Sequence, residues 1–195
     1  MLLAPGIVTL PSFFDQDEIA EIKSFVKWHR MGFGTTAADG ETAEQRTKAR
    51  NEGSDYRKSR VYFIDRKLTY LCEPFVKYDV AIEYANNTYL NQPIGTSDIW
   101  EGYQYADYSE EYQGFYKIHK DSGGSNAMRS RLLSASLQLT DPLEYEGGDL
   151  ILYPRDKKVI APKDIGTITI FLSLINHEVT PVTSGMRNSL VTWVH

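Results

Sequence analysis

The sequence predicts a mainly β fold of the α+β class: a double-stranded β-helix, or jelly roll, with N-terminal helices packed on one of its sheets. Three observations support this. Short segments with strand-like patterns fill the chain after about residue 98, turn residues separate them, and helix-like patterns stay in the first half. We expect one domain over residues 1–195, with supporting strands and helices in residues 1–97 and the jelly-roll core in residues 98–195.

The first elements form a strand followed by an amphipathic helix. Residues 7–10 are a short apolar run that ends at Pro11. Asp15, with Glu18 three residues later, is typical of a helix N-terminus. The apolar and aromatic side chains that follow lie on one helical stripe, namely Ile19, Ile22, Phe25, Val26 and His29.

Residues 30–56 lack such periodicity. Gly, Thr, Ala and Glu dominate there, and charged residues crowd positions 41–50. A long unpatterned stretch in a small domain is disordered or a functional lid, so we expect a mobile segment. After it, residues 60–64 predict a strand and residues 68–90 predict helix, with Pro74 starting a new helix or kinking the first.

The second half of the chain alternates with the period of two that is typical of strands. Leu133, Ala135, Leu137 and Leu139 are interleaved with the polar positions Ser134, Ser136, Gln138 and Thr140. Further strands are expected over residues 149–153, 167–172, 177–182 and 188–194. The turns expected between them lie at Asp141–Pro142, Gly147–Gly148, Pro162–Gly166 and Ser184–Gly185.

Composition excludes several classes of function. The net charge is −5 and the basic residues are spread along the chain, so we expect no nucleic-acid partner. The single cysteine, Cys72, excludes an internal disulfide or a cluster of thiolate ligands. No run of about 18 apolar residues predicts a membrane span. The N-terminus lacks a basic leader before Pro5, and we expect a cytoplasmic protein.

A candidate metal site begins at His119 and Asp121. These residues follow a strand-like segment two positions apart, so their side chains face the same way. Of the remaining histidines, His177 begins a strand-like segment, whereas His29 lies in a helical stripe and His195 ends the chain. His177 is therefore the expected third ligand, although a His-x-Asp pair alone also fits a surface turn.

Two imidazoles and one carboxylate leave three coordination positions open, which non-haem iron(II) oxygenases need. A structural zinc site would prefer four protein ligands, usually including thiolates. Arg187 follows His177 by ten residues. A guanidinium there could bind the distal carboxylate of 2-oxoglutarate in a bidentate manner, although a solvated arginine at a strand edge is the simpler interpretation when Arg187 is considered alone.

Three runs of sequence resemble the prolyl 4-hydroxylase-like branch of the iron/2-oxoglutarate dioxygenases: Leu133–Pro142, Glu146–Leu150 and His177–Arg187. The resemblance covers roughly residues 98–195. It implies iron ligands at His119, Asp121 and His177, and a 2-oxoglutarate contact at Arg187. It also implies co-substrate or pocket positions at Tyr105, at Gln138, where several relatives have an aromatic residue, and at Trp193, which fits plain core packing equally well.

The resemblance further implies a procollagen-proline-like 4-dioxygenase: a hydroxylase that uses Fe(II), 2-oxoglutarate and O2, forms succinate and CO2, and has ascorbate as reductant. Its expected substrate is a prolyl residue of a protein or peptide. Three alternatives stay open. They are the same chemistry on a free amino acid or other small molecule, zinc-assisted hydrolysis, and a catalytically silent jelly-roll binding module.

Overall fold

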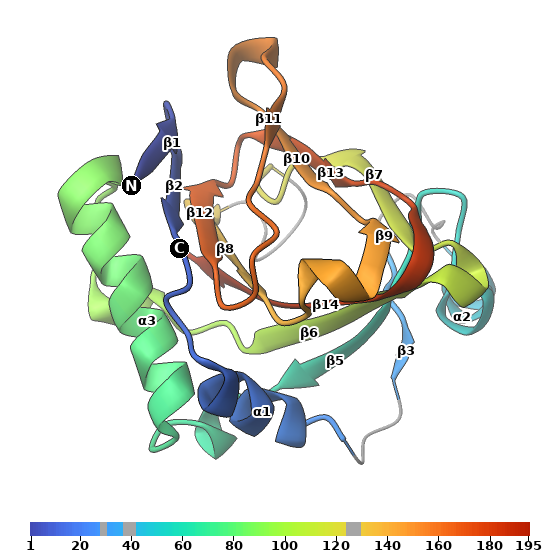
Figure 1. The fold of residues 1–195 in the computed structure, drawn as a ribbon. Coiled ribbons are helices and arrows are strands. Elements are labelled where there is room, and N and C mark those ends of the chain that lie inside the picture. The colour runs from blue at the N-terminus through green and yellow to red at the C-terminus, as the bar shows by residue number, and fades with distance from the viewer. Residues whose placement is uncertain (28–30, 37–41, 124–129) are drawn as a thin grey trace.

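A computed structural model describes residues 1–27, 31–36, 42–123 and 130–195. In these residues the strands form two antiparallel sheets, which face each other as a jelly roll (Figure 1). The larger sheet has nine described strands, eight of them in the order β1-β2-β12-β8-β14-β6-β5-β3, while β9 pairs with β14. The smaller has five, in the order β11-β10-β13-β7-β4. The predicted fold class is therefore confirmed.

The strands of the larger sheet come from both halves of the chain. They are β1 Leu2–Ala4, β2 Ile7–Leu10, β3 Gly32–Phe33, β5 Arg60–Ile64, β6 Tyr103–Ser109, β8 Leu133–Gln138, β9 Tyr145–Gly147, β12 Ile168–Leu172 and β14 Val182–Val194. The smaller sheet consists of β4 Arg57–Lys58, β7 Phe115–His119, β10 Leu150–Tyr153, β11 Val159–Ile160 and β13 Asn176–Val179.

Three α-helices accompany the described strands: α1 Gln16–Ser24, α2 Ala43–Glu52 and α3 Glu73–Ala85, which continues as a π-helical turn over Asn86–Leu90. Short 3₁₀ turns occupy Arg66–Leu68, Thr96–Asp98, Glu110–Tyr112, Pro142–Glu144 and Pro154–Asp156. Figure 1 shows α1 and α3 on the side of the larger sheet that faces away from the smaller one. No helix in the described ranges is long and apolar enough to cross a membrane.

The larger sheet separates two hydrophobic cores, because successive side chains of a strand face opposite ways. One core lies between this sheet and the helices, where Phe75 and Tyr78 of α3 pack with Leu190 of β14. The other lies between the two sheets and includes Tyr108 and Phe171. The apolar positions of β8 face the helices, so its serines and Gln138 are left for the space between the sheets.

The N-terminal elements agree closely with the sequence pattern. Asp15 caps α1 in a capping box with Glu18, as predicted. The helix ends at Ser24, so Phe25 and Val26 pack from the turn that follows, and His29 lies outside the described residues. Pro74 stands in the first turn of α3 and starts a new helix, which is one of the two alternatives expected for it.

Two expectations about local structure need correction. Residues 30–56 are not without regular structure, because α2 forms there behind a Thr42 capping box; residues 37–41 lie outside the described ranges. The expected turn at Ser184–Gly185 lies inside β14, where the register with β9 shifts. Gly185 has a φ of +70°, and a Cβ there would lie 2.0 Å from the Glu144 carbonyl oxygen, so glycine permits an irregular strand as well as a turn.

A buried hydroxyl links α3 to the larger sheet. The Tyr78 hydroxyl donates to the Leu190 carbonyl at 3.0 Å, in a fully buried setting. We expect Tyr78→Phe to lower the free energy of unfolding by about 1 kcal/mol, because the ring stays and one buried hydrogen bond is lost. Urea unfolding would measure this. Tyr84→Phe, on an exposed part of the same helix, is the matched control and should change little.

Candidate active site

Three polar side chains converge between the sheets. His119 ends β7, Asp121 follows it, and His177 lies on the neighbouring strand β13, directly opposite His119. The His119 Nε2 atom lies 3.7 Å from Asp121 Oδ1, and the His177 Nε2 atom lies 3.4 Å from Asp121 Oδ2. One ligand atom from each residue fits within 4.8 Å of the others, a grouping that could hold a metal ion.

Hydrogen bonds fix the tautomers of both histidines. His119 Nδ1 lies 2.8 Å from the Lys117 carbonyl oxygen, and His177 Nδ1 lies 3.0 Å from the Ile175 carbonyl oxygen. A carbonyl oxygen only accepts, so each Nδ1 must donate a proton. In a neutral imidazole this leaves the Nε2 lone pair free, and both Nε2 atoms point toward Asp121.

The surroundings favour the protonation states that a metal requires. Burial and then the neighbouring His177 lower the pKa of His119 to about 3, which keeps its imidazole neutral. Burial alone would raise the pKa of Asp121. The two imidazoles and the Ser134 hydroxyl outweigh it, so the pKa lies below its usual value and the carboxylate is ionised. Neutral imidazoles and a carboxylate are the ligand forms for a divalent cation.

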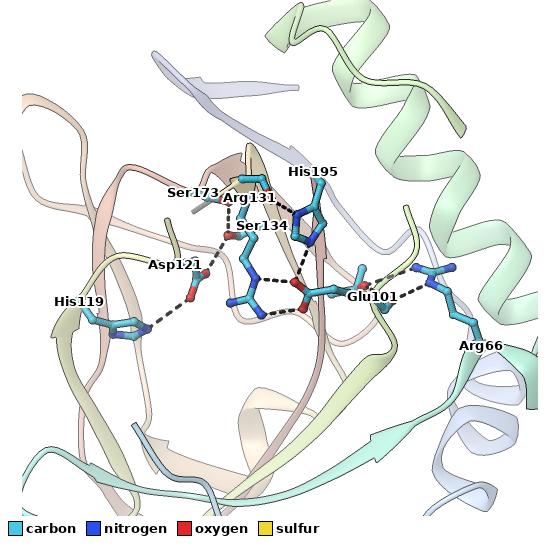
Figure 2. A network of polar contacts seen from close by, with 10 residues as sticks. Arg66, Glu101, His119, Asp121, Arg131, Ser134, Ser173 and His195 are labelled. Atoms are coloured by element: carbon cyan, nitrogen blue, oxygen red, sulfur yellow. Dashed lines mark hydrogen bonds and ion pairs between the residues drawn. The ribbon is translucent and has the colours of Figure 1, made fainter. Parts of the chain in front are cut away.

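The Asp121 carboxylate is held in place from behind. Ser134, on the serine-bearing face of β8, donates its hydroxyl to Asp121 Oδ2 at 2.7 Å. The Ser134 Oγ also lies 2.8 Å from the Ser173 Oγ, and the Asp121 amide donates to the Ser173 carbonyl. Figure 2 shows this chain of contacts beginning at His119. The carboxylate therefore keeps one orientation, with Oδ1 on the side of His119.

We expect Ser134→Ala to weaken metal binding by about 10- to 100-fold, because loss of a hydrogen bond behind a ligating carboxylate has effects of that size. Anaerobic titration of the metal-free protein with Fe(II) would measure the change. Ser136→Ala, two positions along the same face of β8, is the matched control and should bind metal as the wild type does. Equal affinity of the Ser134 variant and this control would show that Ser134 does not orient Asp121.

A cavity of about 380 Å³ adjoins the three residues. Strands of both sheets line it, and its apolar walls include Leu150, Phe171 and Val179. Arg187 of β14 also lines it, although the side chain is only 2% exposed. Burying a charge without a counter-charge costs free energy. A buried guanidinium beside a cavity is therefore expected to bind an anion there.

Arg187 lacks such a partner in the described part of the chain. No carboxylate there lies within ion-pair distance, and Nε has no hydrogen-bond acceptor. Its contacts are with neutral groups: Nη1 donates to the Ser189 hydroxyl at 3.4 Å, and the guanidinium also interacts with the Tyr145 hydroxyl. The guanidinium also lies 5.3 Å from the ring centre of Tyr108. A dicarboxylate with one end at Arg187 would satisfy these donors, so the site fits 2-oxoglutarate.

The remaining predicted residues fall in different places. Trp193 lines the cavity next to the cluster, and its indole is one of the groups that lower the pKa of the Asp121 carboxyl. Gln138 donates to the Tyr145 hydroxyl and lines a small hollow that Arg187 also borders. Tyr105 does not join them, because its side chain packs in the core on the helix side of the sheet. Tyr108, three positions later on β6, faces the cavity instead.

A polar network on the same cavity wall was not predicted from the sequence. Arg131 donates two hydrogen bonds to Glu101, and its guanidinium lies 3.9 Å from the centre of the Trp193 ring. His195 Nε2 also contacts Glu101, at 2.7 Å, so this histidine serves the network and not the three-residue cluster (Figure 2). Glu101 and Arg131 are 30 residues apart, and neither stands in a strand pattern that would have paired them.

A family comparison identifies the core of the chain. Residues 103–195 match a family model described as the 2OG-Fe(II) oxygenase superfamily. Residues 103–195 belong to this superfamily. The matched residues include all of the three-residue cluster and Arg187, so the predicted superfamily is confirmed for the segment that contains the candidate metal ligands.

Curated relatives of this chain are similar over shorter stretches. A PKHD-type hydroxylase of Gloeothece citriformis is 40% identical over 81 residues, which cover 40% of this chain and 36% of that protein. A PKHD-type hydroxylase of Synechococcus is 38% identical over 84 residues, which cover 43% and 38%. The match therefore spans less than two fifths of the length of these relatives.

Solved structures resemble this chain over nearly its whole length. A prolyl-4-hydroxylase of Pseudomonas putida superposes with a TM-score of 0.68 at 20% identity, over 98% of this chain and 93% of that one. A prolyl hydroxylase of Trichoplax adhaerens, in complex with a peptide fragment of the hypoxia inducible factor oxygen degradation domain, gives 0.69 at 16% identity, over 98% and 84%. At such identities the similarity establishes the shared fold.

Proposed function

We propose that this protein is an Fe(II)- and 2-oxoglutarate-dependent hydroxylase that acts on a prolyl residue of a protein or peptide, with O2 as oxidant and with succinate and CO2 as products. One observation supports this most directly. A cavity holds two imidazoles and one carboxylate, together with a buried arginine that has no acidic partner among the described residues. A 2-oxo acid that chelates iron needs the three metal ligands at one end and a cation such as this arginine at the other.

Each residue has a distinct part in this proposal. His119, Asp121 and His177 would hold the metal, and Arg187 would bind the distal carboxylate of 2-oxoglutarate. Bound iron and 2-oxoglutarate would supply the electrons that activate dioxygen for hydroxylation. The apolar walls would keep water from the site, which strengthens the electrostatic contacts within it.

Beyond Arg187, our proposal changes one of the expected co-substrate contacts and keeps two. Tyr108 takes the place of Tyr105 in our proposal, since it lies near the Arg187 guanidinium. Gln138 would hold Tyr145 beside Arg187, because the amide donates to the Tyr145 hydroxyl. Trp193 would complete the wall beside Asp121. Ascorbate is proposed as the reductant that returns oxidised iron to Fe(II).

A prolyl residue in a polypeptide is the preferred substrate for two reasons. Relatives of this fold include prolyl hydroxylases, one of them in complex with a peptide fragment. The cavity also adjoins a larger hollow of about 1120 Å³, which shares four lining residues with it and reaches β3 and α2. The shared residues are Thr35, Arg57, Phe63 and Gln104. An extended chain would fit such a continuous space better than a free amino acid would.

The metal chemistry can be tested without the substrate. Metal-free protein would be loaded with Fe(II) under anaerobic conditions and titrated with 2-oxoglutarate. We expect a weak visible charge-transfer band that saturates with one equivalent and does not form with succinate, which lacks the keto group. Preferential zinc binding without such a band would favour metal-assisted hydrolysis instead.

The substrate class needs a separate experiment. Protein from the native proteome would be incubated with Fe(II), ascorbate and 2-oxoglutarate, and then analysed by mass spectrometry for added oxygen on proline. We expect modified prolines that are absent with His119→Ala. Turnover of free amino acids alone would favour the small-molecule alternative, while an intact charge-transfer band without any 2-oxoglutarate consumption would favour a silent binding module.

A further inference from the structure

A second buried arginine lines the same cavity from the smaller sheet. Arg57 lies on β4, and its side chain is only 6% exposed. The guanidinium donates from Nε to the Ser59 hydroxyl at 2.6 Å and from Nη2 to the Gln104 side-chain oxygen at 2.8 Å. Both acceptors are neutral. In the described ranges no carboxylate lies within ion-pair distance of Arg57, so its charge has no counter-charge.

Two buried arginines line the cavity in the described structure, Arg57 and Arg187, and only the charge of Arg57 lacks a proposed partner. Arg131 is neutralised by its two hydrogen bonds to Glu101. In the proposed function, a divalent metal and Arg187 would be balanced by Asp121 and the two carboxylates of 2-oxoglutarate. The positive charge of Arg57 is left over, and a buried charge without a partner is costly. Among the components of the proposed reaction, the bound substrate is the one that remains to supply a negative charge.

The position of Arg57 is fixed by close packing. One contact is the Tyr116 ring, whose centre lies 4.5 Å from Arg57 Cζ. Another is Gly34, where a Cβ would come within 2.7 Å of the same Cζ atom. A side chain at position 34 would push the guanidinium away from this position. Such a guanidinium is preorganised, so little side-chain entropy is lost when it binds a ligand.

Arg57 also lies close to the metal ligands. It pairs across the strands with Tyr116, and the Tyr116 ring stacks on His119 with centres 3.6 Å apart. One aromatic ring therefore separates the guanidinium from a metal-binding imidazole. Arg187 borders the small hollow beside Gln138, whereas Arg57 borders the large hollow toward β3 and α2. The two arginines thus face different ends of the cavity.

We propose that Arg57 binds a carboxylate of the substrate, and that this protein selects substrates with a carboxylate near the hydroxylated carbon. The inference rests on the proposed function and adds the chemical class of the substrate to it. The carboxylate has three possible sources, namely the α-carboxylate of a free amino acid, the C-terminus of a peptide, and an acidic side chain next to the reacting residue. All three present the same planar, bidentate partner to a guanidinium.

The test compares acids with their amides. Three matched pairs represent the three sources: L-proline with L-prolinamide, N-acetyl-Ala-Pro with its C-terminal amide, and N-acetyl-Ala-Pro-Asp-Ala amide with its Asn analogue. Calorimetry would measure binding to protein loaded with Mn(II) and 2-oxoglutarate, which does not turn over. For at least one pair we expect the acid to bind at least about tenfold more tightly, since a hydrogen-bonded ion pair replaces a neutral contact.

Variants would test whether Arg57 causes the preference for acids over amides. Arg57→Met should bind acid and amide equally, Arg57→Lys should keep part of the preference, and Arg60→Met, on the neighbouring strand, should keep all of it. Circular dichroism would confirm folding. Equal binding of acid and amide by the wild type in all three pairs, including no binding of either, would overturn the proposal, as would an unchanged preference in a folded Arg57→Met protein.

The 2-oxoglutarate charge-transfer titration separates this result from a failure of the proposed function. An intact titration in Arg57→Met together with loss of the acid preference is the expected result. Loss of the charge-transfer band in the wild type would instead contradict the iron and 2-oxoglutarate chemistry. The acid preference measured with Mn(II) would remain a separate binding result.

Discussion

Asp121→Ala is expected to lower 2-oxoglutarate-dependent succinate formation by more than about a thousandfold, because metal ligation contributes several kcal/mol to such a reaction. Asp121 provides the only carboxylate of the three-residue cluster in the described structure, and it lies between both imidazoles. Its loss removes a ligand and the negative charge that offsets the cation. The measurement is succinate formed per enzyme at saturating Fe(II), with bound iron determined in parallel.

Two further variants test whether the loss of activity is specific to the Asp121 carboxylate. Asp121→Asn keeps the shape but not the charge, and it should lose most of the activity as well. Asp17→Ala removes an exposed carboxylate from the first turn of α1 and should behave as the wild type. If Asp121→Ala bound iron normally and retained full turnover, the metal would lie elsewhere in the protein.

Arg187→Met is expected to raise the KM for 2-oxoglutarate by about a hundredfold, because losing one partner of a buried, hydrogen-bonded charge pair costs 2–5 kcal/mol. Arg187→Lys keeps the charge but cannot form a bidentate pair, so a smaller increase is expected. Turnover at saturating 2-oxoglutarate should fall much less than KM rises. Steady-state kinetics over a wide concentration range would separate the two effects.

Arg187→Met should impair 2-oxoglutarate binding without reducing the stability of the free protein. Without co-substrate, Arg187 is a buried charge that has no acidic partner in the described chain. Arg187→Met should therefore leave the unfolding midpoint of the free protein unchanged or higher. Arg155→Met, at an exposed position, is the control for both readouts. A large loss of stability with unchanged 2-oxoglutarate affinity would mean that Arg187 has a structural role.

The sequence predicted those features that depend on local periodicity. Alternation in residues 133–140 placed the serines of β8 on one face, and the structure directs that face toward Asp121. The spacing of His119 and Asp121 likewise placed two candidate ligands together, since positions two apart share a face. The first signal lies within one strand, and the second spans the end of β7 and the two residues that follow it.

Features that depend on pairing between distant segments were not predictable in this way. Tyr105 and Tyr108 both lie on β6, and only the packing of α3 determines which face is the cavity face. Arg57 is 47 residues from Gln104, its hydrogen-bond partner across the sheets, and it follows the segment without periodicity. The serine, glycine and methionine before Arg187 fit a turn as well as the irregular strand that the pairing of β9 produces.

Strand β14 connects the two sides of the larger sheet. Arg187 lines the cavity, whereas the carbonyl of Leu190, three residues later, accepts the hydrogen bond of Tyr78 in α3. A ligand held by Arg187 must therefore be released before this strand can open, so its binding energy adds to the energy of opening. Amide hydrogen exchange along β14 and in α3 would then slow on the addition of 2-oxoglutarate, far from the ligand itself.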